Sequence, residues 1–302
     1  MNLLKLKVVL VAVDTDEASL VTLRAAREFA RAAGATLHIA HVTPVRASDH
    51  QTIHPGRAEA AETARTLLER AGVADGEATF HLLTGEMPAH EIRSLGDRIR
   101  ADVIVLGRHR ARPGSRGEIG STALGVVTNS WAPCLILSRS MSLPLERVLV
   151  PVDLSDTSRG ALLVALSWGS ALRSQAKDGG SKSHEATTTL TALVVARAQE
   201  SAAREPGGVP ALDDELRRLR EVAGRWAGVA IHGAVIAGSD VPEAIAGYAR
   251  EYRPDLVVVG TRGLGLDAVG RLGSVSLGIS RGSDVPLLLV PPAVWKAYGT
   301  TP

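Results

Sequence analysis

Short, uninterrupted runs of apolar residues recur along the chain, and stretches with a helical apolar stripe separate them. Residues 7–14 read KVVLVAVD and residues 256–259 read LVVV. Apolar runs without alternation are typical of strands that are buried on both faces of a parallel sheet. Residues 17–33 place an apolar residue every three or four positions and are followed by Gly34. This pattern predicts an amphipathic helix with a glycine just past its end.

The first half of the chain alternates predicted strands with predicted helices. The strands are expected at residues 7–14, 36–43, 78–83, 103–107 and 134–138, and the helices at residues 17–33, 56–71, 88–100 and 121–130. Strands that are joined by helical crossovers form a parallel sheet with helices on both faces. We therefore expect an α/β fold with a five-stranded, doubly wound sheet.

The same order of elements returns from residue 147. A shift of 153 positions superposes Thr36 on Thr189, Gly85 on Gly238, Ile92 on Ile245, Asp102 on Asp255, Gly107 on Gly260, Gly120 on Gly273, Ser121 on Ser274, Ser130 on Ser283 and Pro133 on Pro286. Asp14 matches Asp153 at a shift of only 139, so the second copy contains a 14-residue insertion. We place the insertion at residues 173–186, which are polar and contain several glycines and serines.

This repeat predicts two tandem Rossmann-like domains. We expect them at residues 1–141 and 145–302, with residues 138–145 as the connection. The final strand of each copy is an apolar edge that is prone to aggregation unless it is covered. We therefore expect the copies to pair through residues 134–138 and 287–290 as an internal pseudo-dimer, while a homodimer of the whole chain stays open.

Composition excludes several classes of partner. The chain has 302 residues, 45% of them hydrophobic, and a formal net charge of +2, which is too balanced to indicate a nucleic-acid partner. Cys134 is the single cysteine and lies in an apolar run, so we expect a buried thiol in a reducing, cytoplasmic compartment. Residues 1–13 read as a first strand, and no segment is long enough to span a membrane.

A glycine-rich stretch follows the apolar run at residues 256–259, and two common nucleotide motifs do not fit it. Gly263-x-Gly265-x-x-Ala268 has the letters of a dinucleotide fingerprint, but further glycines interrupt the required helix and Leu288 stands near the position of the acidic residue. A P-loop that begins at Gly265 would need Lys and Ser or Thr where the chain has Arg271 and Leu272.

A third spacing fits. Gly260 and Gly263 are followed, after nine residues, by Gly273-Ser274 and then by Val275-Ser276. This spacing resembles the ATP-binding signature of the universal stress protein family. The strand end Val150-Pro151-Val152-Asp153 looks like the family's opening motif. With the repeat, the chain resembles a tandem universal stress protein over nearly its whole length.

The resemblance implies an ATP site in the second copy, with Mg²⁺ or Mn²⁺ held through the phosphates. It assigns the adenosine end to Pro151, Val152, Asp153 and Val195, the close backbone approach to Gly260 and Gly263, and the phosphate donors to Gly273, Ser274, Val275 and Ser276. The alternative is structural, because an Asp at a strand end often only caps a helix and glycines often only form turns.

The first copy departs from this signature. Gly107, Gly120 and Ser121 are present, but Arg110 replaces the middle glycine, Ala123 replaces the last serine and Ala12 replaces the proline. The loop at residues 108–116 contains four arginines and His109. They either add charge to a phosphate site or form a solvated loop in which Arg110 fills the vacated pocket, and we favour the second interpretation.

No nucleophile and base, carboxylate pair or metal cluster is evident in the sequence. His38 and His41 share one predicted strand and would indicate a metal pair only if both faced a cavity. The resemblance favours an ATP-binding stress-response regulator with an unidentified protein partner. A slow ATP hydrolase or autophosphorylating enzyme and a ligand-free scaffold remain alternatives.

Overall fold

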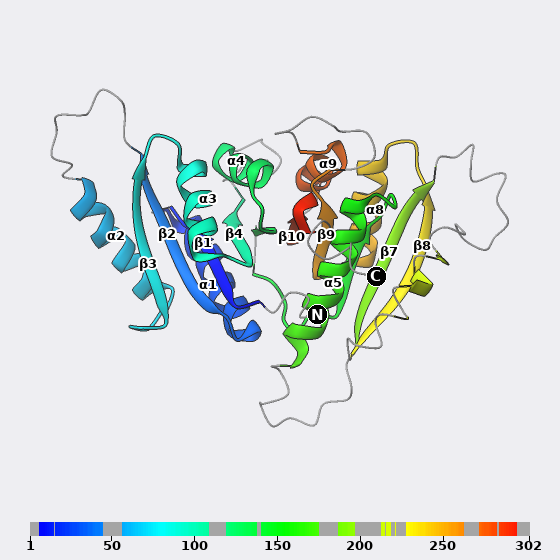
Figure 1. Cartoon of the computed structure of the whole chain (residues 1–302), viewed down its shortest axis with the longest axis horizontal. Helices are drawn as coiled ribbons and strands as arrows, with labels where there is room; N and C mark the ends of the chain where they lie inside the picture. Colours follow the sequence, from blue (N-terminus) through cyan, green and yellow to red (C-terminus); the bar gives the residue numbers. More distant parts are fainter. Residues whose placement is uncertain are drawn as a thin grey trace.

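The strands in the described part of the chain form one ten-stranded sheet. The computed structural model describes residues 6–14, 16–44, 56–108, 119–137, 140–174, 187–196, 213–214, 216–218, 221, 228–262, 272–282 and 284–294. The strand order is β3-β2-β1-β4-β5-β10-β9-β6-β7-β8, so each half of the chain contributes five neighbouring strands (Figure 1). Within each half the strands are parallel, as predicted.

The elements of the first half lie close to their predicted positions. They are β1 (Val8–Ala12), α1 (Glu17–Ala33), β2 (Thr36–Pro44), α2 (Gly56–Arg70), β3 (Ala78–Gly85), α3 (Pro88–Ile99), β4 (Val103–Gly107), α4 (Ser121–Asn129) and β5 (Cys134–Leu137). Helix α1 has the predicted bounds because Asp16 accepts a hydrogen bond from the Ser19 N–H at its start, and Gly34 adopts the left-handed conformation at its end.

The second half repeats these elements. They are β6 (Arg147–Pro151), α5 (Asp156–Ser174), β7 (Thr188–Ala196), β8 (Val229–Ala237), α8 (Val241–Tyr252), β9 (Leu256–Gly260), α9 (Ser274–Gly282) and β10 (Leu287–Val290). The predicted 14-residue insertion needs one correction, because residues 173–174 belong to the last turn of α5. Residues 175–186, the rest of that prediction, lie outside the described part of the chain.

Equivalent residues perform equivalent structural roles in the two halves. The Asp102 carboxylate accepts hydrogen bonds from the Lys7 and Val8 N–H groups, and Asp255 does the same for Glu146 and Arg147. Arg100 and Arg253 both end a helix with a positive φ, of 55° and 51°. The duplication therefore extends from the sequence to single hydrogen bonds and backbone angles.

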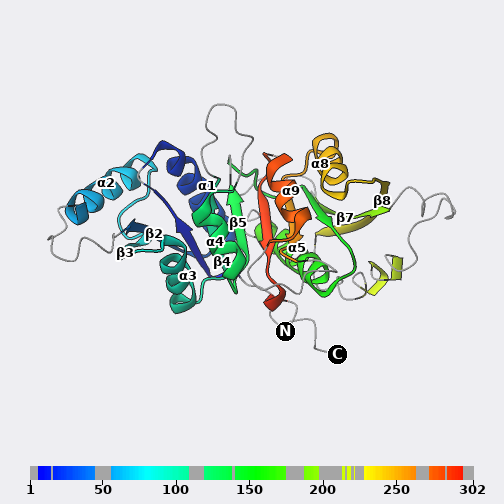
Figure 2. The ribbon, with the colours of Figure 1, turned by 90° about the horizontal axis from the view of Figure 1, so that it is seen from above.

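The halves join through the predicted strands. β5 and β10 are antiparallel, with Leu287 opposite Ile136 and Leu289 opposite Cys134, and they lie side by side in the middle of the molecule (Figure 2). The predicted internal pseudo-dimer is confirmed. Because this pair is antiparallel, the final strands of the two halves run in opposite directions where they meet.

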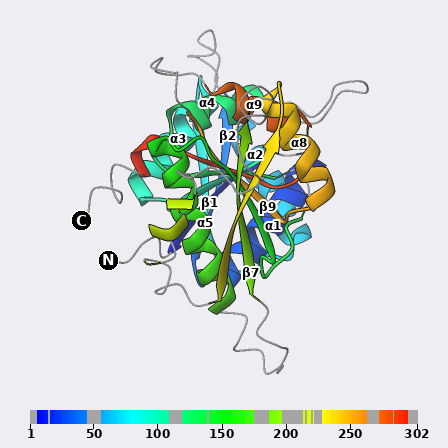
Figure 3. The ribbon, with the colours of Figure 1, turned by 90° about the vertical axis from the view of Figure 1, so that its right-hand side faces the viewer.

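Each face of the sheet carries a hydrophobic layer that crosses this junction. Helices α1 and α5 share one layer, in which the rings of Phe29 and Trp168 approach to 5.0 Å between centroids. These two residues occupy equivalent positions in the repeat. Helices α3, α4, α8 and α9 cover the other face, where α4 and α9 lie near each other (Figures 1 and 3). Among the described helices, none is long and apolar enough to cross a membrane.

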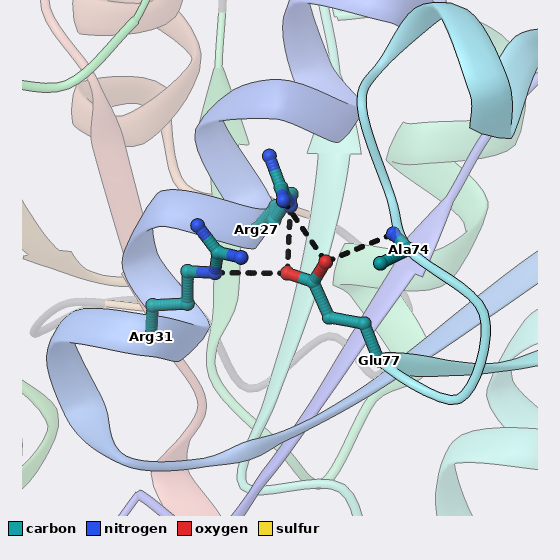
Figure 4. A network of polar contacts seen from close by, with 4 residues as sticks. All are labelled: Arg27, Arg31, Ala74 and Glu77. Atoms are coloured by element: carbon teal, nitrogen blue, oxygen red, sulfur yellow. Dashed lines mark hydrogen bonds and ion pairs between the residues drawn. The ribbon is translucent and has the colours of Figure 1, made fainter.

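A polar cluster fixes the start of β3 to α1 (Figure 4). The Glu77 carboxylate accepts two hydrogen bonds from Arg27, at 2.6 and 2.9 Å, and one from the Ala74 N–H at 3.0 Å. Arg31 lies 2.9 Å from the same carboxylate. The hydrogen bonds from Arg27, with the Ala74 N–H and the two positive charges, lower the pKa of Glu77 to about 2.

We predict that Glu77→Gln lowers the free energy of unfolding by about 1 kcal/mol at neutral pH, because a bidentate charged contact is lost. A pKa that is lower in the folded state stabilises the protein above the ordinary value of 4.5 and loses that effect as the pH falls towards 2. The difference between wild type and variant should therefore narrow below about pH 4.5. Urea unfolding at several pH values measures it.

The matched control is Glu62→Gln, which removes an exposed contact to Arg65 within one helix. It should change the free energy of unfolding by less than about 0.5 kcal/mol. If both variants behave alike, or if the Glu77 effect does not change with pH, the polar cluster does not stabilise β3.

Candidate functional site

The strand ends named by the sequence motifs meet at one edge of the second half. β6 pairs with β9 on one side and with β7 on the other, so the order of strands reverses at β6. In doubly wound sheets, ligands bind beyond the carboxyl ends of the strands at such a reversal. The carboxyl ends of β6 and β9 and the start of α9 therefore define the candidate site.

Asp153 lies at this edge immediately after β6. Its side chain is exposed, and one carboxylate oxygen accepts a hydrogen bond from the Ser155 N–H at 3.0 Å. Leu154 has a positive φ of 62°, which turns the chain sharply from β6 into α5. Asp153 thus holds the turn that precedes α5, and the Ser155 hydroxyl caps the helix by accepting a hydrogen bond from the Ser158 N–H at 3.2 Å.

Pro151, Val152 and Val195 form the apolar part of this edge. Pro151 and Val152 are buried, and the Val152 N–H donates to the Leu193 carbonyl at 2.8 Å. Val195 is half-buried near the end of β7. A methyl carbon of Val195 lies 3.1 Å from the place of a Cβ on Gly238, so this valine packs over the end of the neighbouring strand β8.

Gly260 has a packing role that the sequence did not suggest. A Cβ at this position would lie 2.7 Å from a methyl carbon of Thr157 on α5. In the first half, a Cβ on Gly107 would lie 2.8 Å from the Thr22 hydroxyl on α1. Both glycines therefore let a buried helix threonine approach the strand end, whereas we had expected the missing Cβ to make room for a ligand.

The first turn of α9 is tied back to β9 by two hydrogen bonds. The Gly273 N–H donates to the Thr261 carbonyl at 2.9 Å, and the Ser276 hydroxyl donates to the Gly260 carbonyl at 2.8 Å. Ser276 is 1% exposed, whereas Ser274 is exposed and Val275 is half-buried. Two of the expected phosphate donors are therefore already used within the protein. Gly263 lies outside the described residues.

The corresponding edge of the first half differs. Ala123 stands where the second half has Ser276, so no hydroxyl donates from this position to the carbonyl of Gly107. Arg108 stands at the position of Thr261, and its side chain is only 4% exposed. Its guanidinium lies 3.6 Å from the Asp284 carboxylate of the other half, and burial lowers its pKa despite that negative charge. Arg110 and the rest of the loop at residues 109–118 lie outside the described part.

His38 and His41 point to opposite faces of β2, so they do not form a metal pair. His41 is buried with its Nδ1 3.0 Å from the Val13 carbonyl, and the Nδ1 of His38 instead meets the Nε2 of His81 at 2.9 Å. The described residues contain no group of three or more His, Cys, Asp or Glu side chains that could hold a metal.

Cys134 is buried, as predicted, and burial raises its pKa to about 12.

Sequence reasoning missed Thr22, Thr157 and Arg108. The two threonines gave no signal, because their partners Gly107 and Gly260 are distant in sequence. For Arg108 there was a signal, because the shift of 153 residues places it on Thr261, directly after the strand-end glycine. This match would have distinguished it from the other arginines of the loop.

Comparisons with known proteins agree with the motifs. The model of the universal stress protein family matches residues 5–138 and 144–291. A search of curated proteins found no match. A universal stress protein from Archaeoglobus fulgidus DSM 4304 matches with a TM-score of 0.67 at 22% identity, covering 96% of this chain and 100% of that chain. A functionally unknown protein from Pseudomonas aeruginosa PAO1 matches with a TM-score of 0.63 at 15% identity, covering 97% and 95%.

These two matches show the fold over nearly the whole chain. A universal stress protein from Archaeoglobus fulgidus that was solved in complex with dAMP is also similar, at 26% identity and a TM-score of 0.35. It covers 44% of this chain and 98% of that chain.

We predict that Ser276→Ala lowers the free energy of unfolding by about 1 kcal/mol, because the buried Gly260 carbonyl loses its hydroxyl partner. Ser274→Ala is the control in the same helical turn and should change it by less than about 0.5 kcal/mol, since Ser274 is exposed. Chemical denaturation of the three proteins tests this. Equal stability of wild type and Ser276→Ala would mean that this hydrogen bond does not hold the start of α9.

Proposed function

The chain belongs to the universal stress protein family, and we propose that its second half binds an adenine nucleotide, ATP, to regulate a stress response. The observation that carries this proposal is the convergence of the carboxyl ends of β6 and β9 with the start of α9 at a reversal of strand order. Apolar cover, an exposed carboxylate and a helix N-terminus then lie along one edge, in the order that a nucleoside and its phosphates require.

The adenosine end is assigned to the β6 and β7 side of this edge. The Asp153 carboxylate can accept hydrogen bonds from ribose hydroxyls or from the adenine amino group. Pro151, Val152 and Val195 supply the apolar surface for the base. One oxygen of Asp153 already accepts the Ser155 N–H, so the carboxylate is oriented before a ligand arrives.

The phosphates are assigned to the N-terminus of α9. The first N–H groups of any helix have no acceptor within the helix and favour anions. In α9 these groups belong to Ser274, Val275 and Ser276, and the exposed Ser274 hydroxyl adds a donor. Gly263, in the loop before the helix, is expected to complete this part. Mg²⁺ or Mn²⁺ would be held mainly through the phosphates, since Mg²⁺ commonly binds one carboxylate plus substrate phosphates.

A regulatory role follows from the path between this site and the junction of the halves. Helix α9 begins at the proposed phosphate position and leads through a short loop to β10, which pairs with β5 of the first half. The same loop contains Asp284, the partner of Arg108. Ordering of α9 by a bound nucleotide would therefore act on the contact between the two halves, where a partner protein can detect it.

We predict that Asp153→Asn weakens ATP binding about tenfold, because a charged acceptor for the nucleoside is lost while an oxygen for the Ser155 N–H remains. Isothermal titration calorimetry measures the affinity. Asp14→Asn, at the equivalent position of the first half, is the matched control and should leave the affinity unchanged. Equal effects of the two substitutions, or no effect of either, would contradict the site assignment.

We also predict one ATP per chain. The first half lacks the Ser276 hydroxyl and places a buried Arg108 where the second half has Thr261. Its Val13 carbonyl, at the position of Val152, is engaged by the buried His41 ring. Equilibrium dialysis gives the stoichiometry, and two equivalent sites per chain would show that the arginine-rich loop of the first half binds phosphate after all.

A further inference from the structure

The first half contains a pair of histidines that the nucleotide site does not use. His38 on β2 and His81 on β3 lie diagonally across two neighbouring strands, with Nδ1 and Nε2 2.9 Å apart. Their ring planes are nearly parallel, at 16° to each other, with the ring centroids 5.2 Å apart. The pair lies on the face of the sheet that α3 covers, since their neighbours Ala40 and Leu83 belong to that hydrophobic layer.

The hydrogen bond between the two rings requires that only one of the two facing nitrogens carries a proton. A neutral imidazole has one N–H donor and one bare acceptor nitrogen, so a hydrogen bond between two rings needs one facing nitrogen to be bare. If both rings become charged, N–H groups face each other from the two sides and two positive charges meet. The hydrogen bond is then replaced by repulsion.

The second half has no histidine pair at the equivalent positions. At the positions of His38 and His81 it has Thr191 and Ala234. The Thr191 hydroxyl donates instead to the Tyr252 hydroxyl at 2.9 Å. The contact at this place in the second half therefore joins β7 to α8 and is neutral at the same pH, whereas the histidine contact joins β2 to the outer strand β3.

We propose that His38 and His81 form an acid-sensitive latch, which holds the outer strand β3 against β2 at neutral pH and releases it on acidification. Among the described strands β3 pairs with β2 alone, and it also contacts α3. On the opposite face, Glu77 anchors the start of β3 to α1. The latch therefore acts on the middle and the carboxyl end of β3, while the start of the strand stays fixed.

The direction with pH follows from the surroundings of the two rings. Burial lowers the pKa of His38, and burial, the charge of His38 and the charge of Arg98 on α3 lower the pKa of His81. Glu91 on α3 packs against Gly85 at the far end of the strand. His41 faces the other side of β2. Stabilisation by the pair is thus complete above about pH 6.5 and is lost below it.

The Glu77 anchor operates in a different range. Its pKa of about 2 keeps the carboxylate charged well after the histidines have become protonated. Because the pKa values of both histidines lie below their ordinary value but that of Glu77 is about 2, acidification opens the latch while the anchor remains closed. Mild acid loosens one end of an edge strand and leaves the rest of the sheet intact.

Hydrogen exchange of the full chain tests the latch, with a chelator in every sample. Protection factors, corrected for the intrinsic effect of pH on exchange, are compared at about pH 7.5 and about pH 5.5. Those of β3 should fall about fivefold on acidification, while those of β8 should stay constant. A similar fall in both strands, or none in β3, would overturn the proposal.

The matched variant His38→Thr/His81→Ala carries the residues of the second half. It should show no specific change in β3 between the two pH values, and a response like that of the wild type would exclude the latch. Nitrogen NMR of the wild-type imidazoles gives an answer that does not depend on the variant's folding. Both rings should titrate below pH 6.5 and lose their mutual hydrogen bond, and titration at or above 6.5 would contradict the latch. Recovery of β3 protection at low pH on adding Zn²⁺ without chelator would identify a metal pair instead.

Discussion

The antiparallel pairing of β5 with β10 is the interaction on which the rest of the structure depends. Both strands are fully buried and apolar, and each would be an exposed edge without the other. Their pairing merges two five-stranded sheets into one and lets two hydrophobic layers run across the junction. The halves therefore share their hydrophobic core. A structural change at the end of either final strand affects the packing of both halves.

The two candidate edges have the same framework and different chemistry. In both halves a glycine at the end of the fourth strand lets a threonine from a helix pack closely against it. This contact is therefore part of the fold and does not by itself indicate a ligand. The halves differ in the groups that surround it. The second half has a serine that fixes α9 to the strand end, and the first half has a buried arginine that reaches Asp284. The asymmetry thus comes from a few side chains on a common backbone.

Much of the fold was predictable because apolar periodicity and the internal repeat constrain the same elements twice. β4, α1 and the α9 start follow from runs, stripes and glycines that are local in sequence. Contacts between distant residues were not predictable in this way. The Ser276 hydroxyl was expected to face a phosphate but donates to Gly260, and His38 was considered with His41 because they are close in sequence, whereas its partner is His81. At the site, the pattern identifies the residues, while the way in which each side chain is already occupied depends on packing.

The contact between Phe29 and Trp168 lies at the local two-fold axis that relates the halves. In a homodimer, every residue on such an axis meets its own copy, and every substitution is introduced twice. Fusion of the two copies into one chain removes this restriction. A phenylalanine can then meet a tryptophan of larger volume, and an arginine can meet an aspartate whose counterpart on the other side is Trp131. Gene duplication thus allows different residues to face each other across the interface. Each half can then lose or gain a function without the other.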